Sequence, residues 1–229
     1  REDWDFGPSL GALAAEAGDA ALVAARFVAP LRPVRAVWFI SDEPGKARGW
    51  LRRTAPRGTL ALRAAVERGE ADILVQTPYL VLSPAARDLV RDLRAARPGL
   101  RFRISTNSFA STDNLLAYSA NYRLRNLYIE QLGLEVHEFK PRPAVLPVLF
   151  PRHAEMDRLA AQAKPGARPP FFSLHAKSLV VDQAVAFVGS YNLDPRSENL
   201  NTECGVLIED ADFARELRAE IERDLRPEN

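Results

Sequence analysis

Residues 175–192 read HAKSLVVDQAVAFVGSYN, and this stretch decides the fold. Its two apolar runs, residues 177–182 and 184–188, are rich in valine and predict two strands. The intervening residues Asp182 and Gln183 predict a tight turn. Polar residues precede the first strand and follow the second, so we expect them to meet at the open end of this strand pair.

Four polar side chains at this open end predict a site for an oxyanion. His175 and Lys177 are two residues apart, so on a strand they point to the same face, about 7 Å apart. Ser190 and Asn192 add a hydroxyl and an amide from the end of the next strand. A histidine can attack phosphorus or protonate a leaving oxygen, while a cation and neutral donors stabilise the phosphoryl oxygens. The set suits a phosphodiester.

Two acidic residues lie near this group in the sequence. Glu203, if it reaches the other imidazole nitrogen, fixes the tautomer of His175 and stabilises the imidazolium. Asp182, at a strand end, belongs to the site or only forms the turn, and the sequence leaves both readings open. The other histidines, His137 and His153, belong to no cluster of metal ligands, so we expect neither a metal nor a cofactor.

The upstream half alternates strands with helices. The pattern predicts strands over residues 34–40, 71–76, 100–105 and 134–139, and helices over residues 59–68, from Ser83 to about residue 98, and from residues 111–113 to about residue 132. Thr59 and the segment Ser111–Asp113 are the expected caps of two of these helices. A further strand over residues 202–208 and a helix over residues 211–225 complete an α/β domain, a mixed β-sheet flanked by helices.

Two segments stand apart from this alternation. Residues 1–33 predict a lead-in or linker with one helix over residues 20–28, so the domain spans residues 34–229. Residues 141–170 hold seven of the 17 prolines, which excludes a central strand and predicts a surface insertion with at most a short helix near residues 155–162. Its apolar run, residues 144–150, either touches a membrane or packs on its own domain.

Composition narrows the class of protein. The 229 residues are 47% apolar and 27% charged, which excludes a disordered chain and a collagen-like one. The single cysteine, Cys204, excludes an internal disulfide scaffold. A net charge of +1 gives no global signal for nucleic acid. Only four of the 31 basic residues are lysines, which draws attention to Lys177.

The stretch from His175 to Asp182 resembles the HKD motif of the phospholipase D superfamily. Residues 187–203, FVGSYNLDPRSENLNTE, are more similar to its bacterial cardiolipin synthase branch. Upstream, QTPY at residues 76–79 and STNSFASTD at residues 105–113 resemble further segments of that branch. The resemblance covers roughly residues 34–225 and implies a phospholipase D-like fold containing one HKD half.

The resemblance also implies roles for the residues of the motif. His175 would be the catalytic histidine, as nucleophile forming phosphohistidine or as general acid. Lys177 and Asn192 would hold the phosphate oxygens, with Ser190 as a supporting donor. Glu203 would orient His175.

Further positions follow from the same resemblance. Asp182 would define the motif while serving a structural purpose. Candidates for contacts with the substrate are Tyr79, Thr106, Asn107 and Ser108. Ser111 and Asp113 either join them or only cap a helix.

One departure from the family pattern shapes the functional hypotheses. A working site in this superfamily uses two HKD motifs, and this sequence holds one. Because the sequence starts at Arg1 and its single methionine is Met156, we expect the C-terminal half of a two-motif enzyme that begins between the motifs. The second motif would come from the same polypeptide or from a homodimer mate.

Three hypotheses remain open on the sequence alone. The first is a phosphatidyltransferase that makes cardiolipin from phosphatidylglycerol or a similar phospholipid, at the bacterial inner membrane, peripheral or anchored through upstream sequence. The second is a homodimeric phosphodiesterase or endonuclease, for which Arg123, Arg125 and the stretch Arg48–Arg57 could line a groove, although the near-neutral charge argues against nucleic acid. The third is an inert half-site, a folded module that lacks its partner.

Overall fold

The computed structural model describes residues 7–46, 55–151, 153–162, 166 and 171–229. The chain divides into two compact units, Arg1–Val34 and Arg35–Asn229. In the described part of the first unit, α1 (Gly7–Gly18), α2 (Ala20–Val23) and η1 (Ala24–Val28) are helical. The last two form one continuous helix that covers the predicted range, and Asp19 caps it through Ala21 and Leu22.

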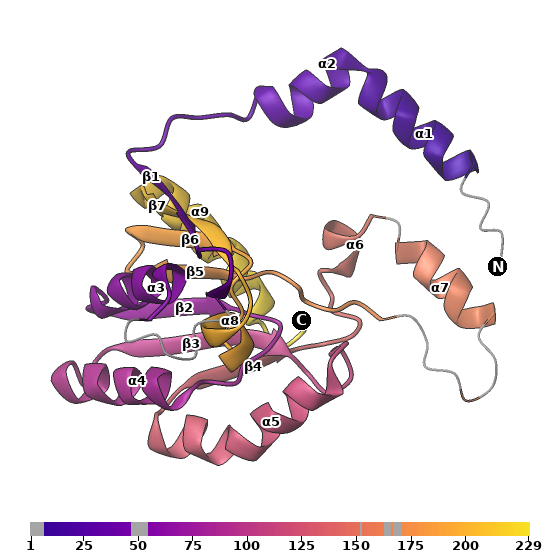
Figure 1. Cartoon of the computed structure of the whole chain (residues 1–229). Helices are drawn as coiled ribbons and strands as arrows, with labels where there is room; N and C mark the ends of the chain where they lie inside the picture. Colours follow the sequence, from indigo (N-terminus) through magenta and orange to yellow (C-terminus); the bar gives the residue numbers. More distant parts are fainter. Residues whose placement is uncertain (1–6, 47–54, 152, 163–165, 167–170) are drawn as a thin grey trace. The chain divides into compact units, whose positions relative to one another are not determined.

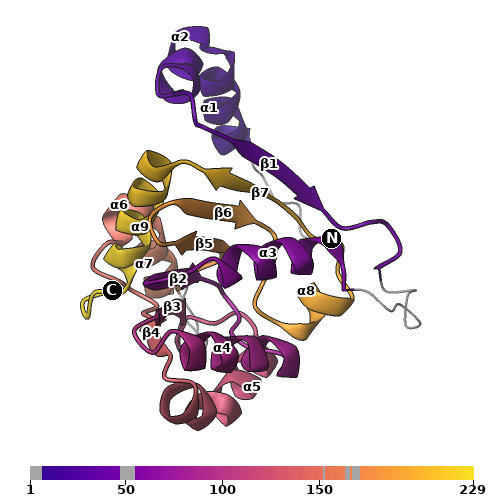
Figure 2. The same ribbon diagram turned by 90° about the vertical axis from the view of Figure 1, so that its left-hand side faces the viewer.

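The second unit is built on a seven-stranded mixed sheet, ordered β1-β7-β6-β5-β2-β3-β4 (Figures 1 and 2). β2 pairs with β3, and β3 with β4, in the parallel direction. The other four strand pairings are antiparallel. The strand bounds are β1 Val37–Ser41, β2 Asp72–Gln76, β3 Arg101–Asn107, β4 Glu135–Phe139, β5 Ser178–Val181, β6 Val185–Gly189 and β7 Cys204–Glu209. Each predicted strand is therefore present, within a few residues.

Helices cover both faces of this sheet. The helix bounds are α3 Arg57–Glu67, α4 Pro84–Ala96, α5 Leu115–Asn126, η3 Leu127–Gln131, α6 Leu146–Leu149, α7 His153–Gln162, α8 Pro195–Asn199 and α9 Ala211–Asp224. Alternate strand residues such as Ile73 and Leu179 join the larger core with α3 and α4. Their neighbours Leu74 and Val180 pack instead against α9.

Two predicted caps are wrong. α3 begins two residues before Thr59, with Pro56 at the cap position, and the hydroxyl of Thr59 pairs instead with that of Tyr191 at 3.0 Å. The cap of α5 is Asn114, whose side chain accepts from the backbone of Ala117 at 3.0 Å, so the segment Ser111–Asp113 lies before the helix. Before α5 four consecutive residues, Ser111 to Asn114, can all cap a helix, and the sequence did not single out Asn114; at α3 the cap residue is a proline, whose side chain makes no capping hydrogen bond.

The proline-rich segment holds the short helices α6 and α7, and α7 matches the predicted position. Part of its apolar run packs on its own domain, which is one of the two readings that the sequence left open. Val145 and Leu146 are buried, whereas Val148 is exposed and so is Leu149. Among the described residues, no helix combines the length and the apolar character that crossing a membrane requires.

The topology brings loops from five strands to one end of the sheet. Gln76, at the end of β2, pairs with Ser178, at the start of β5. Gly189, at the end of β6, pairs with Gly205, and Ser41 of β1 pairs with Cys204. The segments that follow β1, β2 and β6 and precede β5 and β7 therefore meet at this end.

Gly189 and Gly205 lie opposite each other on β6 and β7. A Cβ built on Gly189 would lie 2.5 Å from the carbonyl oxygen of Cys204 and 2.7 Å from the ring of Phe187. The two strands and the buried Phe187 ring thus leave no room for a side chain at this position.

We expect Gly189→Ala to lower the free energy of unfolding by about 1–3 kcal/mol, the cost of overpacking. Gly99→Ala is the matched control, because a Cβ there meets no atom within 4 Å. Urea unfolding followed by circular dichroism measures both. Equal stability of the two variants would contradict the close approach of β6 and β7.

Asp224 is a buried acid near the end of α9, and it accepts a hydrogen bond from the side-chain amide of Gln76. Burial raises the pKa of Asp224 to about 6, although that hydrogen bond and the charge of Arg223 oppose the shift. The folded chain therefore holds a proton that the unfolded chain releases, and stability falls as the pH rises from the ordinary aspartate value through about 6.

Asp224→Asn should raise the free energy of unfolding near pH 7.5 by on the order of 2 kcal/mol, since it removes a buried charge while keeping the shape. The gain should shrink towards zero near pH 4, where the folded wild type is already protonated. Urea titrations at both pH values provide the measurement. A gain that does not change with pH would show that the charge of Asp224 is not its cause.

Candidate active site

His175 and Lys177 lie in an extended segment that leads into β5, rather than on the strand as the sequence predicts. β5 begins at Ser178, and the Lys177 ammonium donates to the carbonyl oxygen of His175 at 2.7 Å. His175 is exposed and Lys177 is half-buried. Because Gly189 donates its N–H to the carbonyl of Lys177 at 3.1 Å, the end of β6 lies directly beside this segment.

Asn107 holds the same segment from the other side. Its amide accepts from the N–H of Leu174 at 2.9 Å and donates to the carbonyl of Leu174 at 2.8 Å. A side-chain amide that pairs with both backbone groups of one residue replaces a strand partner. The residue before His175 is thereby fixed to the end of β3.

Ser190 and Asn192 follow β6, as the sequence predicts. The Ser190 hydroxyl donates to Glu203 at 2.5 Å and accepts from the N–H of Cys204 at 3.0 Å. The N–H of Asn192 donates to the hydroxyl of Ser197 at 3.1 Å. The side-chain oxygen of Asn192 is buried and has no hydrogen-bond partner among the residues that the structure describes.

The Glu203 carboxylate is the centre of this arrangement. It is 5% exposed, and its two oxygens accept from the hydroxyls of Ser190 and Ser197, at 2.5 and 2.6 Å. The sequence predicts a bond to the imidazole of His175, but in the described part of the chain neither oxygen makes one. Glu203 instead fixes the loop that carries Ser190 and Asn192.

A buried ion pair, Asp42 and Lys46, supports Glu203. The sequence did not identify this pair as part of the site. The Lys46 ammonium donates to Asp42 at 2.6 Å and to the backbone carbonyl of Ser197 at 2.5 Å. Asp42 also accepts from the N–H groups of Glu203 at 3.1 Å and Gly58 at 2.8 Å. The only sequence signals were the scarcity of lysine and the i,i+4 spacing of the pair.

These contacts govern the charge of Asp42. Burial by itself raises the pKa of its carboxyl, but the hydrogen bonds from Lys46, Gly58 and Glu203 and the charge of Lys46 hold the pKa below its ordinary value. Asp42 therefore stays ionised, and the Lys46 cation balances it.

Lys177 is the half-buried cation of this group of residues. Partial burial lowers the pKa of the Lys177 ammonium, while the carboxylates of Glu203, Asp113 and Asp194 act in the opposite direction. A half-buried ammonium carries less water than a surface lysine, so its charge is less screened.

The residues predicted to contact the substrate fall into two groups. Tyr79 is half-buried and donates to both oxygens of Asp113, at 2.9 and 3.1 Å. Burial, the hydrogen bond to Asp113 and the charge of Asp194 raise the pKa of Tyr79 to about 12, so its hydroxyl remains a donor at neutral pH. Ser108 is half-buried and its hydroxyl pairs with that of Ser111 at 3.0 Å.

Thr106 and Asn107 form the second group. Both are 1% exposed, and their side chains are bonded to the backbone carbonyls of Pro78 and, for Asn107, Leu174. They influence the site through the segments that they hold together.

Asp182 lies at the opposite end of β5 from Lys177. With Gln183 it forms a turn in which both residues have positive φ, 49° and 56°. Its carboxylate accepts from the N–H groups of Glu70, Ala71 and Asp72, at 2.5, 2.9 and 2.8 Å. These three bonds tie the β5–β6 hairpin to the start of β2 and give Asp182 a structural task.

The chemistry that the site offers follows from its groups. His175 and Lys177 precede β5 and Ser190 and Asn192 follow β6, so the four residues lie at the same end of the sheet, and buried carboxylates hold the surrounding loops. Among the described residues, no three His, Cys, Asp or Glu side chains are grouped to hold a metal ion. The arrangement fits an oxyanion whose charge is compensated by lysine and hydrogen-bond donors.

The chain is similar in sequence to a known family and to individual proteins of bacteria. The family model described as "Cardiolipin synthase, PLD-like domain" matches residues 62–225. Cardiolipin synthase C of Escherichia coli strain K12 is 31% identical over 179 residues, which is 77% of this chain and 34% of that protein. An uncharacterized protein of Helicobacter pylori strain J99 is 28% identical over 71% of this chain and 28% of its own length. The chain therefore spans about a third of these relatives.

Two solved structures share the fold at 16% sequence identity. Nuc from Salmonella typhimurium, a phospholipase D family member, aligns with a TM-score of 0.53 over 82% of this chain and 93% of its own. Phosphatidylserine synthase of Haemophilus influenzae Rd KW20 aligns with a TM-score of 0.55 over 83% of this chain and 38% of its own. With the family match over most of the sheet and its helices, the chain belongs to the phospholipase D superfamily, in the family of cardiolipin synthase phospholipase D-like domains.

Proposed function

We propose that this chain is one HKD half of a phosphatidyltransferase that makes cardiolipin. The observation that carries the proposal is the meeting of His175, Lys177, Ser190 and Asn192 at one end of the sheet, around the buried carboxylate of Glu203. The 31% identity to cardiolipin synthase C supports a phospholipid substrate over other phosphodiesters.

The proposed reaction proceeds in two displacements. In the first, an imidazole nitrogen attacks phosphorus, an N–P bond forms, and the P–O bond to the leaving alcohol breaks while that oxygen takes a proton from an acid. In the second, the hydroxyl of phosphatidylglycerol loses its proton to the same group and attacks the phosphohistidine, which restores the free imidazole. His175 serves either as this nucleophile or as the acid, and the second HKD half supplies the other role.

The remaining side chains act on the phosphoryl oxygens. Lys177 compensates the charge that builds up on them in each displacement, and the amide of Asn192 donates to them. Ser190 is bonded to Glu203 and keeps the loop in position, so that Asn192 does not have to be ordered when substrate binds. Because transfer releases one alcohol and consumes another, the outcome depends on keeping water from the phosphohistidine.

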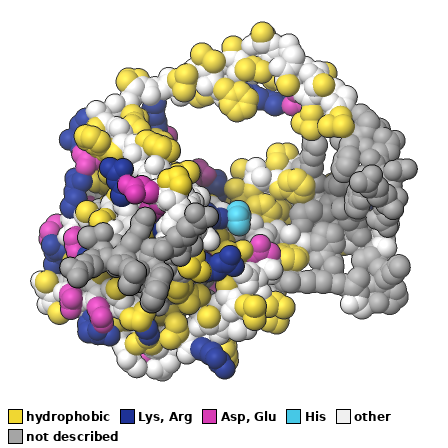
Figure 3. Space-filling model, viewed as in Figure 1, with side chains coloured by type: hydrophobic (Ala, Val, Ile, Leu, Met, Phe, Trp, Pro, Cys, Tyr) yellow, Lys and Arg dark blue, Asp and Glu magenta, His cyan; other side chains and the backbone are white. Residues whose placement is uncertain are grey.

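An endonuclease acting as a homodimer is the competing proposal, and the net charge of only +1 disfavours it. Figure 3 shows basic and acidic side chains interspersed over the described part of the face in view, without a continuous basic stripe. The guanidinium of Arg125, one of the arginines that could line a groove, lies 3.9 Å from the carboxylate of Glu138, which offsets its charge. Most of the arginine-rich stretch Arg48–Arg57 lies outside the described residues.

In a full-length two-motif protein that contains this chain, we expect His175→Ala to reduce cardiolipin formation in membranes at least about 1,000-fold, because neither displacement can proceed without both histidines. His153→Ala, in α7, is the matched control and should retain wild-type synthesis. Lipid extraction with mass spectrometry gives the measurement. Undiminished synthesis by His175→Ala would rule the proposal out, and DNA cleavage without lipid transfer would favour the endonuclease.

A further inference from the structure

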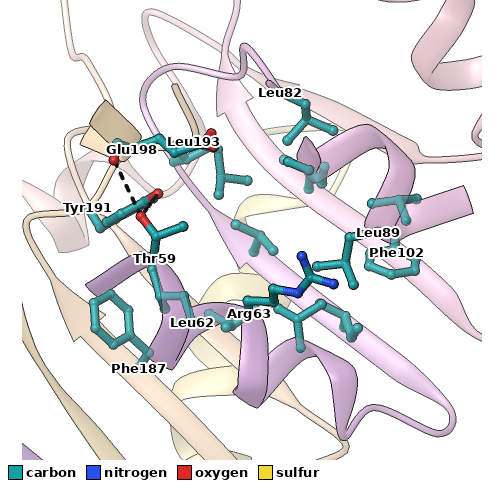
Figure 4. Close-up of a pocket in the computed structure, with 18 of the residues that line it drawn as sticks. Thr59, Leu62, Arg63, Leu82, Leu89, Phe102, Phe187, Tyr191, Leu193 and Glu198 are labelled. Carbon is teal, nitrogen blue, oxygen red and sulfur yellow. Dashed lines mark hydrogen bonds between the residues drawn. The ribbon is translucent and has the colours of Figure 1, made fainter. Parts of the chain in front are cut away.

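A cavity of about 220 Å³ lies between helices α3 and α4 and the sheet (Figure 4). Ile73 and Phe102 on the strands face it from one side, and Leu62 and Leu89 on the helices face it from the other. Protein interiors are close-packed, so an apolar space of this size is uncommon. An engineered apolar cavity of about 150 Å³ stays dry and binds benzene, which shows that hydrocarbon, rather than water, fills such spaces.

The small side chains of α4 keep the cavity open. Ala85 and Ala86 follow Pro84 in the first turn of the helix and both line the space. Ala86 is half-buried and packs against the core that contains Val75 and Leu179, so a larger side chain there would enter the space, whereas Ala85 is exposed. The cavity therefore depends on particular residues of this sequence.

One end of the cavity is polar and belongs to the candidate active site. Along β5, alternate residues face the helices, and continuing the alternation from Leu179 by two residues places Lys177 on the same side. The pairing of Gln76 with Ser178 sets Thr77 opposite Lys177. Both residues line the cavity, as does Tyr191.

The cavity thus combines an apolar body with two charged residues besides Arg63, the basic Lys177 and the acidic Glu198. The Lys177 side chain beside an apolar space is the feature that a ligand would complement. This matches an amphiphile with a negative headgroup next to a hydrocarbon chain. A nucleic-acid strand would instead need cations along the whole path. Arg63, an arginine of the lining, is paired with Glu67 at 2.7 Å.

We infer that this cavity binds one acyl chain of the phospholipid whose phosphate lies at His175 and Lys177. The inference rests on the proposed function and goes beyond it, because it names the part of the lipid that the chain recognises besides the headgroup. Because a cavity with an apolar lining holds no ordered water, an acyl chain can enter it without breaking hydrogen bonds to water. The chain then fills the space between α3, α4 and the sheet to the density of a protein interior.

Binding of water-soluble lipids to the 229-residue chain tests the inference without relying on catalysis. The series comprises glycerophosphoglycerol and the dibutanoyl, dihexanoyl and diheptanoyl phosphatidylglycerols, each titrated by calorimetry below its micelle concentration. We expect the affinity to rise about fourfold for each methylene taken into the cavity, which corresponds to ~0.8 kcal/mol per buried methylene. An affinity that is independent of chain length would overturn the inference.

Variants of α4 locate the effect. Ala86→Phe fills the cavity and should abolish the chain-length dependence while keeping the wild-type affinity for glycerophosphoglycerol. Ala95→Phe makes the same substitution at an exposed position of α4 and should keep both. Leu89→Trp provides a second filling variant, and an unchanged thermal unfolding midpoint verifies that each variant folds.

Parallel chain-length series for Ala86→Phe and Ala95→Phe would also overturn the inference. The two proposals fail separately. If His175→Ala leaves cardiolipin synthesis intact while acyl-chain binding depends on Ala86, the proposed reaction fails and the binding site stands. If chain length has no effect while His175 is essential, only the binding site fails.

Discussion

The buried carboxylate of Glu203 is the constraint on which the rest of the site depends. Removing a carboxylate from water costs several kcal/mol unless partners compensate it. Here the hydroxyls of Ser190 and Ser197 bond to its oxygens, and its backbone N–H is bonded to Asp42. These bonds join the loop after β6, the helix α8 and the segment after β1 into one unit. The position of Asn192 is then a consequence of satisfying Glu203.

A buried ion pair, Asp42 and Lys46, lies beside this carboxylate and is neutral as a whole. Lys46 neutralises Asp42, while the charge of Glu203 acts to raise the pKa of the Lys177 ammonium against the effect of burial. In the proposed function, an oxyanion meets a Lys177 ammonium that is already positioned by the carbonyl oxygen of His175. The cavity that Lys177 lines would, by the inference above, bind an acyl chain of the same phospholipid.

The sequence predicted the sheet and the gathering of polar residues because both depend on local patterns. Valine-rich alternation predicts β5 and β6, and the turn at Asp182 joins them. Contacts between residues far apart in the sequence could not be predicted in this way. Lys46 meets the carbonyl of Ser197 across 151 positions of sequence, and no local pattern encodes that pairing. The resemblance implies that Glu203 orients His175, and only the folded structure shows that the hydroxyls of Ser190 and Ser197 bond to its oxygens.

The most direct test of this account is a crystal structure of the chain with tungstate, a tetrahedral oxyanion. We predict that tungstate binds between the imidazole of His175 and the ammonium of Lys177, within hydrogen-bond distance of the side-chain amide of Asn192. Glu203 should stay bonded to Ser190 and Ser197 and make no contact with the ion. Tungstate found only at surface arginines, with the site beside Lys177 empty, would contradict the account.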